Sequence, residues 1–271
     1  MEKEVFNIEP FTMEMSSCAS KEEMNSNVQA SIDRGYTRIN EFLGTFSGEL
    51  AICGSAPSIR DTFPDIKGDI LAINSAIRFL IENDIPPRFA MIWDASPLCE
   101  HFAVPHPATT YLIGARCHPA VFEKLKDCKV IVWHAGGDHN ISDFLAQRKI
   151  EEPLINGGSA GVTRALYLGC ALGYRKFNLY GADSSYSDEG DTHVMGSLVP
   201  EKDFRVWVTY NNEAIPFRTT PEMVAQVEEY MKIATHFNDS GMPTKVFGNG
   251  LLLHIDKLLQ RKKLDDANLI L

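Results

Sequence analysis

The chain has 271 residues, 44% of them hydrophobic, which is enough to bury the core of one large α/β domain or of two small ones. Its formal net charge of −10 argues against a broad contact with duplex nucleic acid, because such contacts need lysines and arginines clustered on one face. The 6 cysteines include no C-x-x-C pair, so the sequence indicates neither a structural zinc site nor a disulfide framework.

The N-terminal segment, residues 1–24, is polar and acidic and has no clear helical period, so we expect a flexible arm. It lacks the apolar stretch of a secretory signal, and the chain contains no run of about 18 apolar residues. We therefore expect a cytoplasmic protein with no membrane contact, in which 25–271 form a single domain. The spacing of Val28, Ile32, Tyr36 and Ile39 predicts a helix over 25–43.

Short apolar runs of strand length then alternate with segments of helical period. The predicted strands span 50–53, 70–73, 89–93, 110–113, 130–133 and 177–180. The predicted helices span 75–82, 119–126 and 159–172. Continuous apolar strands that alternate with helices are typical of a parallel sheet covered on both faces. The sequence therefore predicts an α/β fold: a Rossmann-like, doubly wound, mainly parallel sheet with helices on both faces.

The C-terminal part of the chain begins with a different element. Two strand-like runs around Asn211-Asn212 predict a small β-hairpin over 204–217, inserted beside the parallel sheet. A helix over 221–237 follows, with Thr220 as its N-cap. A strand at 244–247 and a terminal helix complete the predicted domain.

The strongest local signal for a binding site is the turn after the first sheet strand. It reads Gly54-Ser55-Ala56-Pro57-Ser58, where small residues let the backbone approach a ligand closely. A phosphate would be held there by backbone amides and by the Ser55 or Ser58 hydroxyl. The spacing matches neither a Walker A loop nor a complete G-x-G-x-x-G, so an ordinary tight turn is the alternative.

Polar side chains also follow the next strands at their carboxyl ends, where open parallel sheets bind ligands. Asp94 comes directly after 89–93 and could coordinate Mg²⁺ or hold a ribose hydroxyl. Asn74 has the equivalent place after 70–73 and is a candidate nucleotide-binding residue. For both residues the alternative is a cap of the following helix.

A second glycine-rich segment, Gly157-Gly158-Ser159, opens the helix over 159–172. Amide groups at a helix N-terminus favour negative charge, so this segment is a second candidate phosphate site. Close packing of the helix on a strand explains the glycines equally well. Asp183 follows the strand at 177–180, and we expect it at a strand end adjacent to that of Asp94, where the two carboxylates could share one divalent ion that bridges phosphates.

The polar segment 184–192 ends at His193 and could form a lid over the site. His193 is then a candidate general acid or base, or a phosphate contact, and a solvated loop histidine is the alternative. Any acceptor pocket beyond the phosphates should be built from 184–217.

These motifs together resemble the MptE-like proteins, named for the archaeal 6-hydroxymethylpterin diphosphokinase, and the central domain of the motility accessory factors that glycosylate flagellin. The resemblance covers roughly 25–195. It is carried by Gly54 to Ile59, Asp84-Ile85-Pro86-Pro87-Arg88, Asp94, Gly157-Gly158-Ser159 and Gly181-Ala182-Asp183. Ala56, where the family usually has glycine, and Arg88, where it often has aspartate, depart from the pattern.

The resemblance implies a nucleotide-dependent transferase and leaves its reaction open. In one branch, ATP with Mg²⁺ would donate diphosphate to a small hydroxymethyl acceptor similar to a pterin, and this is our leading prediction. In the other branch, a glycosyltransferase would use a CMP-activated sugar similar to sialic acid. A nucleotide-binding module without catalysis is a further alternative. The acceptor is not identified, and association of the chain into a homo-oligomer is left open.

Overall fold

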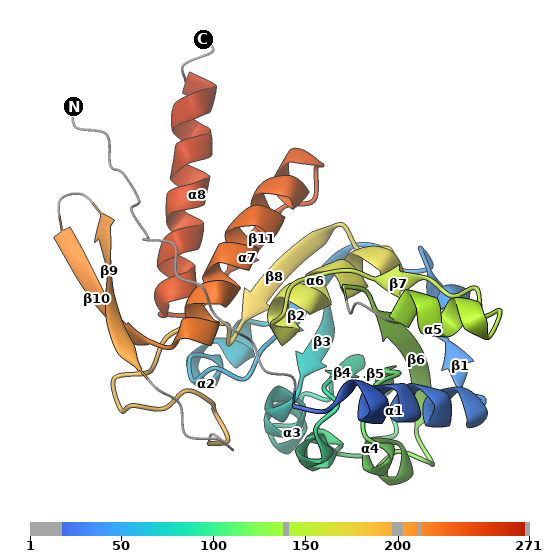
Figure 1. Ribbon diagram of the computed structural model, residues 1–271. Helices are drawn as coiled ribbons and strands as arrows, with labels where there is room; N and C mark the ends of the chain where they lie inside the picture. Colours follow the sequence, from blue (N-terminus) through green and yellow to red (C-terminus); the bar gives the residue numbers. More distant parts are fainter. Residues whose placement is uncertain (1–17, 138–140, 197–202, 211–212, 269–271) are drawn as a thin grey trace.

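The fold is known from a computed structural model, which describes residues 18–137, 141–196, 203–210 and 213–268 (Figure 1). Most of the predicted N-terminal arm lies outside these residues. Among the described residues, no helix is long and apolar enough to cross a membrane.

A parallel sheet forms the centre of the molecule. Eight strands follow one another in the order β1-β6-β5-β4-β3-β2-β8-β11, and β7 also pairs with β6. Every pairing in this sheet is parallel. The strands are β1 (Thr37–Arg38), β2 (Glu49–Cys53), β3 (Asp69–Ile73), β4 (Phe89–Ile92), β5 (Thr110–Gly114), β6 (Lys129–Ala135), β7 (Leu154–Ile155), β8 (Lys176–Tyr180) and β11 (Thr244–Val246). The six predicted inner strands are confirmed to within two residues at each end.

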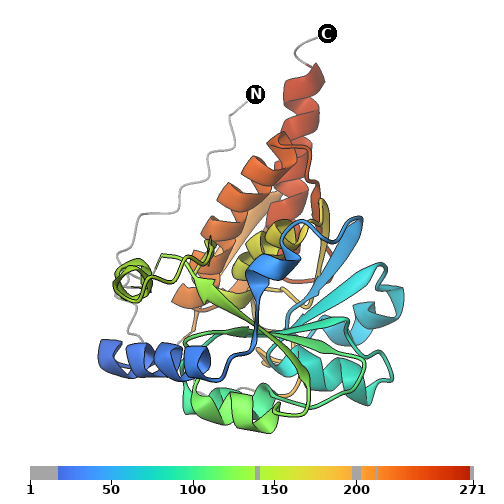
Figure 2. The same cartoon turned by 90° about the vertical axis from the view of Figure 1, so that its right-hand side faces the viewer.

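Helices cover both faces of the sheet, as the Rossmann-like prediction requires (Figures 1 and 2). One face packs against α6 (Gly161–Leu172), α7 (Pro221–Asp239) and α8 (Leu251–Asn268). The other packs against α1 (Lys21–Asp33), α2 (Ile59–Thr62), α3 (Ser75–Glu82), α4 (Pro119–Lys124) and α5 (Ile141–Gln147). Short 3-10 helices are η1 (Ile39–Phe42), η2 (Phe63–Asp65) and η3 (Pro97–Phe102).

The alternation of side chains along β2 shows how one strand serves both cores. Leu50 and Ile52 are fully buried on the side of α6, whereas Ala51 and Cys53 are fully buried on the side of α3. Successive side chains of a strand point to opposite faces, so a strand buried on both faces becomes a continuous apolar run. This is the pattern from which the parallel sheet was predicted.

The N-terminal helix differs from its prediction at both ends. It begins at Lys21 rather than 25, because the Ser20 hydroxyl accepts from the Glu23 amide while the Glu23 carboxylate accepts from the Ser20 amide. It ends at Asp33, and Gly35 then adopts a left-handed φ of 65°. The chain beyond this point pairs with β6 as β1, a sheet contact that overrides the helical period of the sequence.

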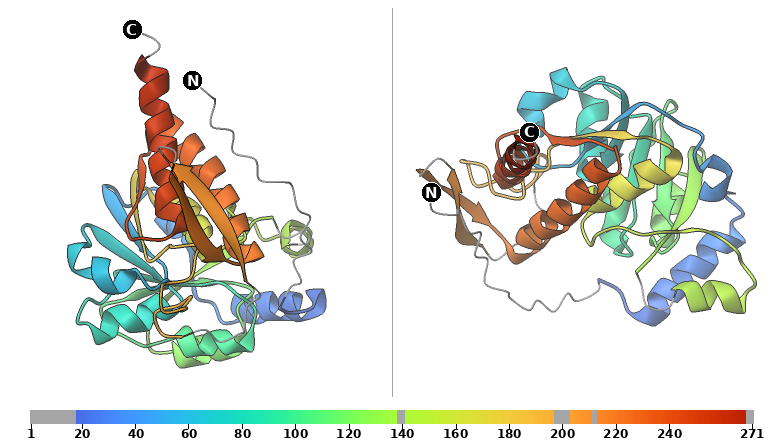
Figure 3. Two further views of the ribbon diagram at one scale, coloured as in Figure 1. Left: turned by 90° about the vertical axis from the view of Figure 1, so that its left-hand side faces the viewer. Right: turned by 90° about the horizontal axis from the view of Figure 1, so that it is seen from above.

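The predicted hairpin is present as β9 (Phe204–Tyr210) and β10 (Glu213–Thr219), which pair only with each other among the described strands. Its inner face, which includes Val208, packs into the core near α8 (Figure 3). On its outer face Trp207, opposite Pro216, is 59% exposed. The hairpin therefore forms a wall beside the carboxyl end of the sheet.

The edge strand β11 has its outer amides capped by side chains. The Val246 amide donates to Asp256 Oδ2 at 3.2 Å, and the Tyr230 hydroxyl donates to Asp256 Oδ1 at 2.6 Å. Asp256 is 2% exposed, so its loss would leave the Val246 amide without its acceptor in the core and the Tyr230 hydroxyl with the longer contact to Thr244 Oγ1 at 3.4 Å. Asp256→Ala should therefore lower the free energy of unfolding by about 3 kcal/mol in urea denaturation. The exposed Asp65→Ala is the control, and equal effects of the two changes would contradict this role.

Candidate functional site

A small pocket of about 150 Å³ lies at the carboxyl ends of β2, β3 and β8. The turn after β2, the N-terminal ends of α3 and α6, and the segment after β8 form its walls, together with part of α7. Of the predicted site residues, it is lined by Gly54, Ser55, Ala56, Asn74, Asp183 and His193. The structure therefore brings half of the predicted site residues together at the edge of the sheet expected for this fold.

The turn after β2 is held against the turn after β8 through backbone groups. The Gly54 amide donates to the Tyr180 carbonyl at 2.8 Å, and the Ala56 amide donates to the Gly181 carbonyl at 2.9 Å. A Cβ atom on Gly54 would lie 2.4 Å from the Gly181 oxygen, which no real contact allows. Glycine is thus required here for the approach of two backbone segments, not only for access of a ligand.

The turn has fewer free amides than the sequence suggested. The amides of Gly54 and Ala56 already donate within the protein, and the Ser58 amide donates to Asp183 Oδ2 at 3.0 Å. Pro57 has no amide hydrogen. Among the described residues, the Ser55 amide and hydroxyl have no hydrogen-bond partner, so Ser55 is the donor that this turn offers to the small pocket.

Asp183 lines the small pocket, but both of its carboxylate oxygens are used to fasten the turn. Its second oxygen, Oδ1, accepts a short hydrogen bond from the Ser58 hydroxyl. The residue is 4% exposed, and burial raises the pKa of its carboxyl above the ordinary value although the hydrogen bonds from Ser58 act in the other direction. Ser58 and Pro57 line the larger neighbouring pocket instead of the small one.

The magnesium site predicted for Asp94 with Asp183 is not formed. Asp94 follows β4, and β3 and β2 separate β4 from β8, which places the two strand ends roughly 14 Å apart at the usual strand spacing. Asp94 Oδ1 instead accepts from the Ser96 amide at 3.0 Å and from Cys18 Sγ at 2.6 Å. Among the described residues, no three His, Cys, Asp or Glu side chains lie together as a metal ion would need.

Asp94 is therefore expected to be dispensable for ligand binding. Asp94→Asn keeps an oxygen that can accept from the Ser96 amide, so we expect nucleotide affinity to stay within about twofold of the wild-type value. Calorimetric titration of both proteins with the same nucleotide measures this. A tenfold loss of affinity in the variant would show that Asp94 contacts the ligand after all.

The predicted phosphate site at Gly157, Gly158 and Ser159 is filled by the chain's own carboxylate. The Ser159 amide donates to both oxygens of Glu229, at 2.8 and 2.9 Å, and the Thr163 hydroxyl donates to Glu229 Oε2 at 3.0 Å. Glu229 comes from α7, so an anion does occupy the position that the sequence indicated. It is supplied by the protein, and the segment lines neither of the pockets at this edge.

Two residues of the small pocket combine strained backbone with unpaired oxygens. Asn74 and Ser184 adopt φ angles of 50° and 52°, although neither is a glycine. Asn74 Oδ1 and Ser184 Oγ are buried and have no hydrogen-bond partner among the described residues. Strain and unsatisfied polar groups both cost free energy and are concentrated at functional sites. The sequence indicated Asn74 but carried no signal for Ser184.

His193 lies on the loop after β8, with its ring half-buried at the small pocket. Burial lowers its pKa below the ordinary value of 6.5, so the imidazole is neutral at pH 7. Its Nδ1 lies 2.9 Å from the Thr192 hydroxyl. A neutral histidine in a polar pocket can accept a proton from a bound hydroxyl.

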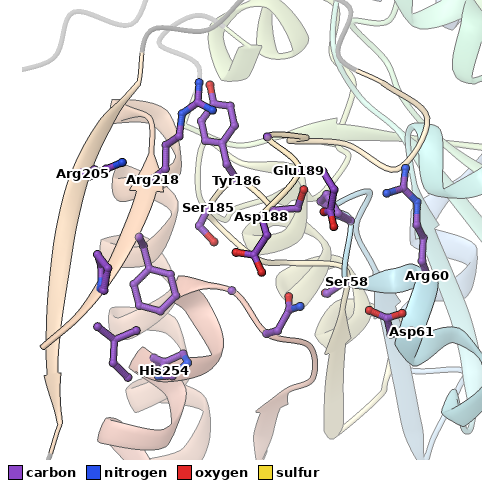
Figure 4. A pocket seen from close by; sticks show the side chains of 18 residues that line it. Ser58, Arg60, Asp61, Ser185, Tyr186, Asp188, Glu189, Arg205, Arg218 and His254 are labelled. Carbon is purple, nitrogen blue, oxygen red and sulfur yellow. The ribbon is translucent and has the colours of Figure 1, made fainter. Parts of the chain in front are cut away.

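A larger pocket of about 870 Å³ adjoins the small one, and Ser185 lines both (Figure 4). The hairpin contributes Arg205 and Arg218 on one side, and α2 contributes Arg60 and Asp61 on the other (Figure 4). Asp188, Glu189 and His254 also line it, and burial lowers the pKa of His254 below its ordinary value. Much of its wall comes from 184–217, where the acceptor pocket was expected. The sequence did not single out its arginines, because their shared pocket arises from contacts between distant segments.

The sequence matches the family described as 6-hydroxymethylpterin diphosphokinase MptE-like over residues 25–189, which is more than half of the chain. The chain belongs to the MptE-like family. Both pockets are built partly from this MptE-like segment, whereas His193 and the hairpin lie beyond it. No curated protein sequence matches the chain.

The fold of this MptE-like chain is similar to a solved structure, that of the MAf glycosyltransferase from Magnetospirillum magneticum AMB-1. The two share 17% sequence identity with a TM-score of 0.62, over 90% of this chain and 41% of the solved one. The chain thus spans less than half the length of that protein. The likeness confirms the Rossmann-like fold and the second predicted resemblance.

Proposed function

We propose that this MptE-like protein is a nucleotide-dependent transferase that moves a sugar from a nucleotide-activated donor to a hydroxyl group of an acceptor. The family match and the glycosyltransferase with a similar fold support a transferase. One observation carries the proposal: a neutral histidine, His193, lies in the same pocket as the unpaired oxygens of Asn74 and Ser184.

In this proposal the nucleotide phosphate binds in the small pocket. Ser55 would donate to it, and the first turn of α6, which reaches the pocket at Gly161 and Val162, would add a favourable helix dipole. Asn74 Oδ1 would accept a hydrogen bond from a hydroxyl or amino group of the ligand. A volume of about 150 Å³ is too small for a whole nucleotide, so the remainder of the substrates would occupy the larger pocket.

The chemistry follows from the position of His193. Its imidazole would remove the proton of the acceptor hydroxyl while that oxygen forms a bond to the anomeric carbon of the sugar. The bond from this carbon to the phosphate oxygen would break, and the nucleotide would leave with the electron pair. Positioned general bases contribute about 10²- to 10⁴-fold to such steps.

Diphosphate transfer from ATP to a hydroxymethyl acceptor is the second candidate, and the description of the family favours it. That reaction uses Mg²⁺ held by oxygen ligands. The carboxylates predicted for this metal do not fit, because Asp183 is bonded to Ser58 and Asp94 follows a strand that two others separate from β8.

A panel of nucleotides tests the proposal, because a ligand that binds the native state raises the melting temperature. We expect CMP to raise it equally with and without EDTA. At 100 times the dissociation constant, the stabilisation should be about 2.7 kcal/mol. A response confined to ATP with Mg²⁺ would contradict sugar transfer, and no response to any nucleotide would contradict nucleotide dependence.

Two asparagines on opposite ends of α3 supply matched variants for this assay. Asn74→Ala removes the unpaired amide oxygen at the pocket and should greatly reduce the response to CMP. Asn83→Ala alters the exposed end of the same helix and should leave the response unchanged. A binding module without catalysis would show the same shifts in melting temperature with CMP but would transfer no sugar.

A further inference from the structure

Arg60 connects the turn after β2 to the loop that carries His193. It is the second residue of α2, directly after the turn, and its side chain crosses to the segment after β8. Its Nη2 donates to the Val194 carbonyl at 2.9 Å, and its Nη1 lies 3.4 Å from Asp191 Oδ2. Both partners of the ion pair have side chains 46% exposed, so this pair adds little by itself. The bond to the carbonyl is the better defined contact.

The same loop is attached to the turn by a second contact. The Val194 amide donates to the Ser55 carbonyl at 2.7 Å, and Val194 is 6% exposed. Val194 is therefore bound at both its amide and its carbonyl, directly after His193. Thr192, on the other side, is 7% exposed and contacts the His193 ring. The backbone directly after His193 is thus fixed at Val194, and Arg60 supplies one of the two bonds that fix it.

We propose that Arg60 is a positioning residue for His193, which it holds at the small pocket by fastening Val194 and Asp191 to α2. The proposal rests on the proposed function, because it gives His193 the role of base. Arg60 itself lines the larger pocket and need not touch the reacting atoms.

An arginine suits this role better than a lysine. The planar guanidinium offers several donors in fixed directions, so it can bind a carbonyl and a carboxylate together. A lysine of similar reach has one charged nitrogen and can keep the carbonyl contact alone. The conservative change should therefore preserve part of the positioning, whereas a glutamine should preserve little of it.

The pKa of His193 reports whether its ring stays buried at the small pocket, because few other titratable groups lie there. Among the described residues that line the small pocket, the other titratable side chain is Asp183, which is bonded to Ser58. The helices contribute uncharged groups there, including Met223 and Gln226 from α7. Asp188, Glu189 and Asp191 are charged residues of the loop itself, and Arg60 is the charged side chain that binds the loop from α2. Burial lowers the pKa of His193, so a ring released toward water should titrate closer to 6.5.

The test compares Arg60→Gln and Arg60→Lys with Arg78→Gln, which alters an exposed arginine of α3 paired with Glu82. The pKa of His193 is measured by NMR titration of the histidine rings, assigned with His193→Asn. We expect Arg60→Gln to raise this pKa and Arg60→Lys to raise it less, with no change in Arg78→Gln. Turnover should fall about 10- to 100-fold in Arg60→Gln, while KM should stay within about threefold of the wild-type value. A misplaced catalytic group slows the chemical step and leaves substrate binding nearly unchanged.

A purely structural role predicts a different result. It would lower the melting temperature of Arg60→Gln without moving the pKa of His193, and this outcome would overturn the proposal. The titration uses the free protein, so it also separates two failures. If no nucleotide binds, the proposed function fails, while the pKa comparison still decides whether Arg60 controls the position of His193.

Discussion

Gly54→Ala should lower the free energy of unfolding by about 3 kcal/mol, which corresponds to a fall in melting temperature of roughly 6 to 12 °C. The added methyl group would meet the Gly181 carbonyl oxygen at 2.4 Å and Val162 at 3.1 Å. A backbone oxygen cannot rotate away as a side chain can. The two turns would have to separate, which would also widen the small pocket.

Gly44→Ala is the control for this change. Gly44 has a left-handed φ of 67° and nothing within 4 Å of an added Cβ, so its replacement measures backbone strain without a clash. We expect a cost of about 1 kcal/mol there. Thermal or urea denaturation measures the loss in free energy of unfolding for both variants. If this loss were no larger for Gly54→Ala than for Gly44→Ala, the close packing of the Gly54 turn against Gly181 would be contradicted.

His193→Asn should reduce turnover by about 10²- to 10⁴-fold while leaving nucleotide affinity nearly unchanged, since a general base acts in the chemical step. The rate should also depend on pH. The base works in its neutral form, so activity should be complete above pH 6.5 and should be lost as the pH falls through the lowered pKa of His193.

His101→Asn is a suitable control, because His101 lies exposed on η3 and lines neither pocket. It should keep the wild-type rate and pH profile. Equal activity of His193→Asn and the wild type would remove His193 from the mechanism. A parallel loss of affinity and rate would assign it to binding.

The features predicted correctly from the sequence are those that local patterns determine. A strand such as β2 has to be apolar on both faces, and a helix such as α3 carries its own period, so both could be found without knowing their neighbours. Asn74 and the Gly54 turn were found because ligand sites in such folds follow the carboxyl ends of strands.

The features that were missed depend on which strands and helices become neighbours. Asp94 and Asp183 were paired on the assumption that their strands are adjacent, but β8 pairs with β2 and β11. Glu229 lies 70 residues beyond Ser159, whose amide it accepts from, and no local sequence pattern predicts this contact. The arginines of the larger pocket likewise come from α2 and from the hairpin, which only the folded chain brings together.

The most direct test of the site is a crystal structure of the protein soaked with CMP. We predict that the phosphate lies in the small pocket, within hydrogen-bond distance of Ser55 and close to the first turn of α6, with Asn74 bonded to the nucleotide. A phosphate bound beside Asp94, or at Ser159 in place of Glu229, or a nucleotide in neither pocket, would contradict this account.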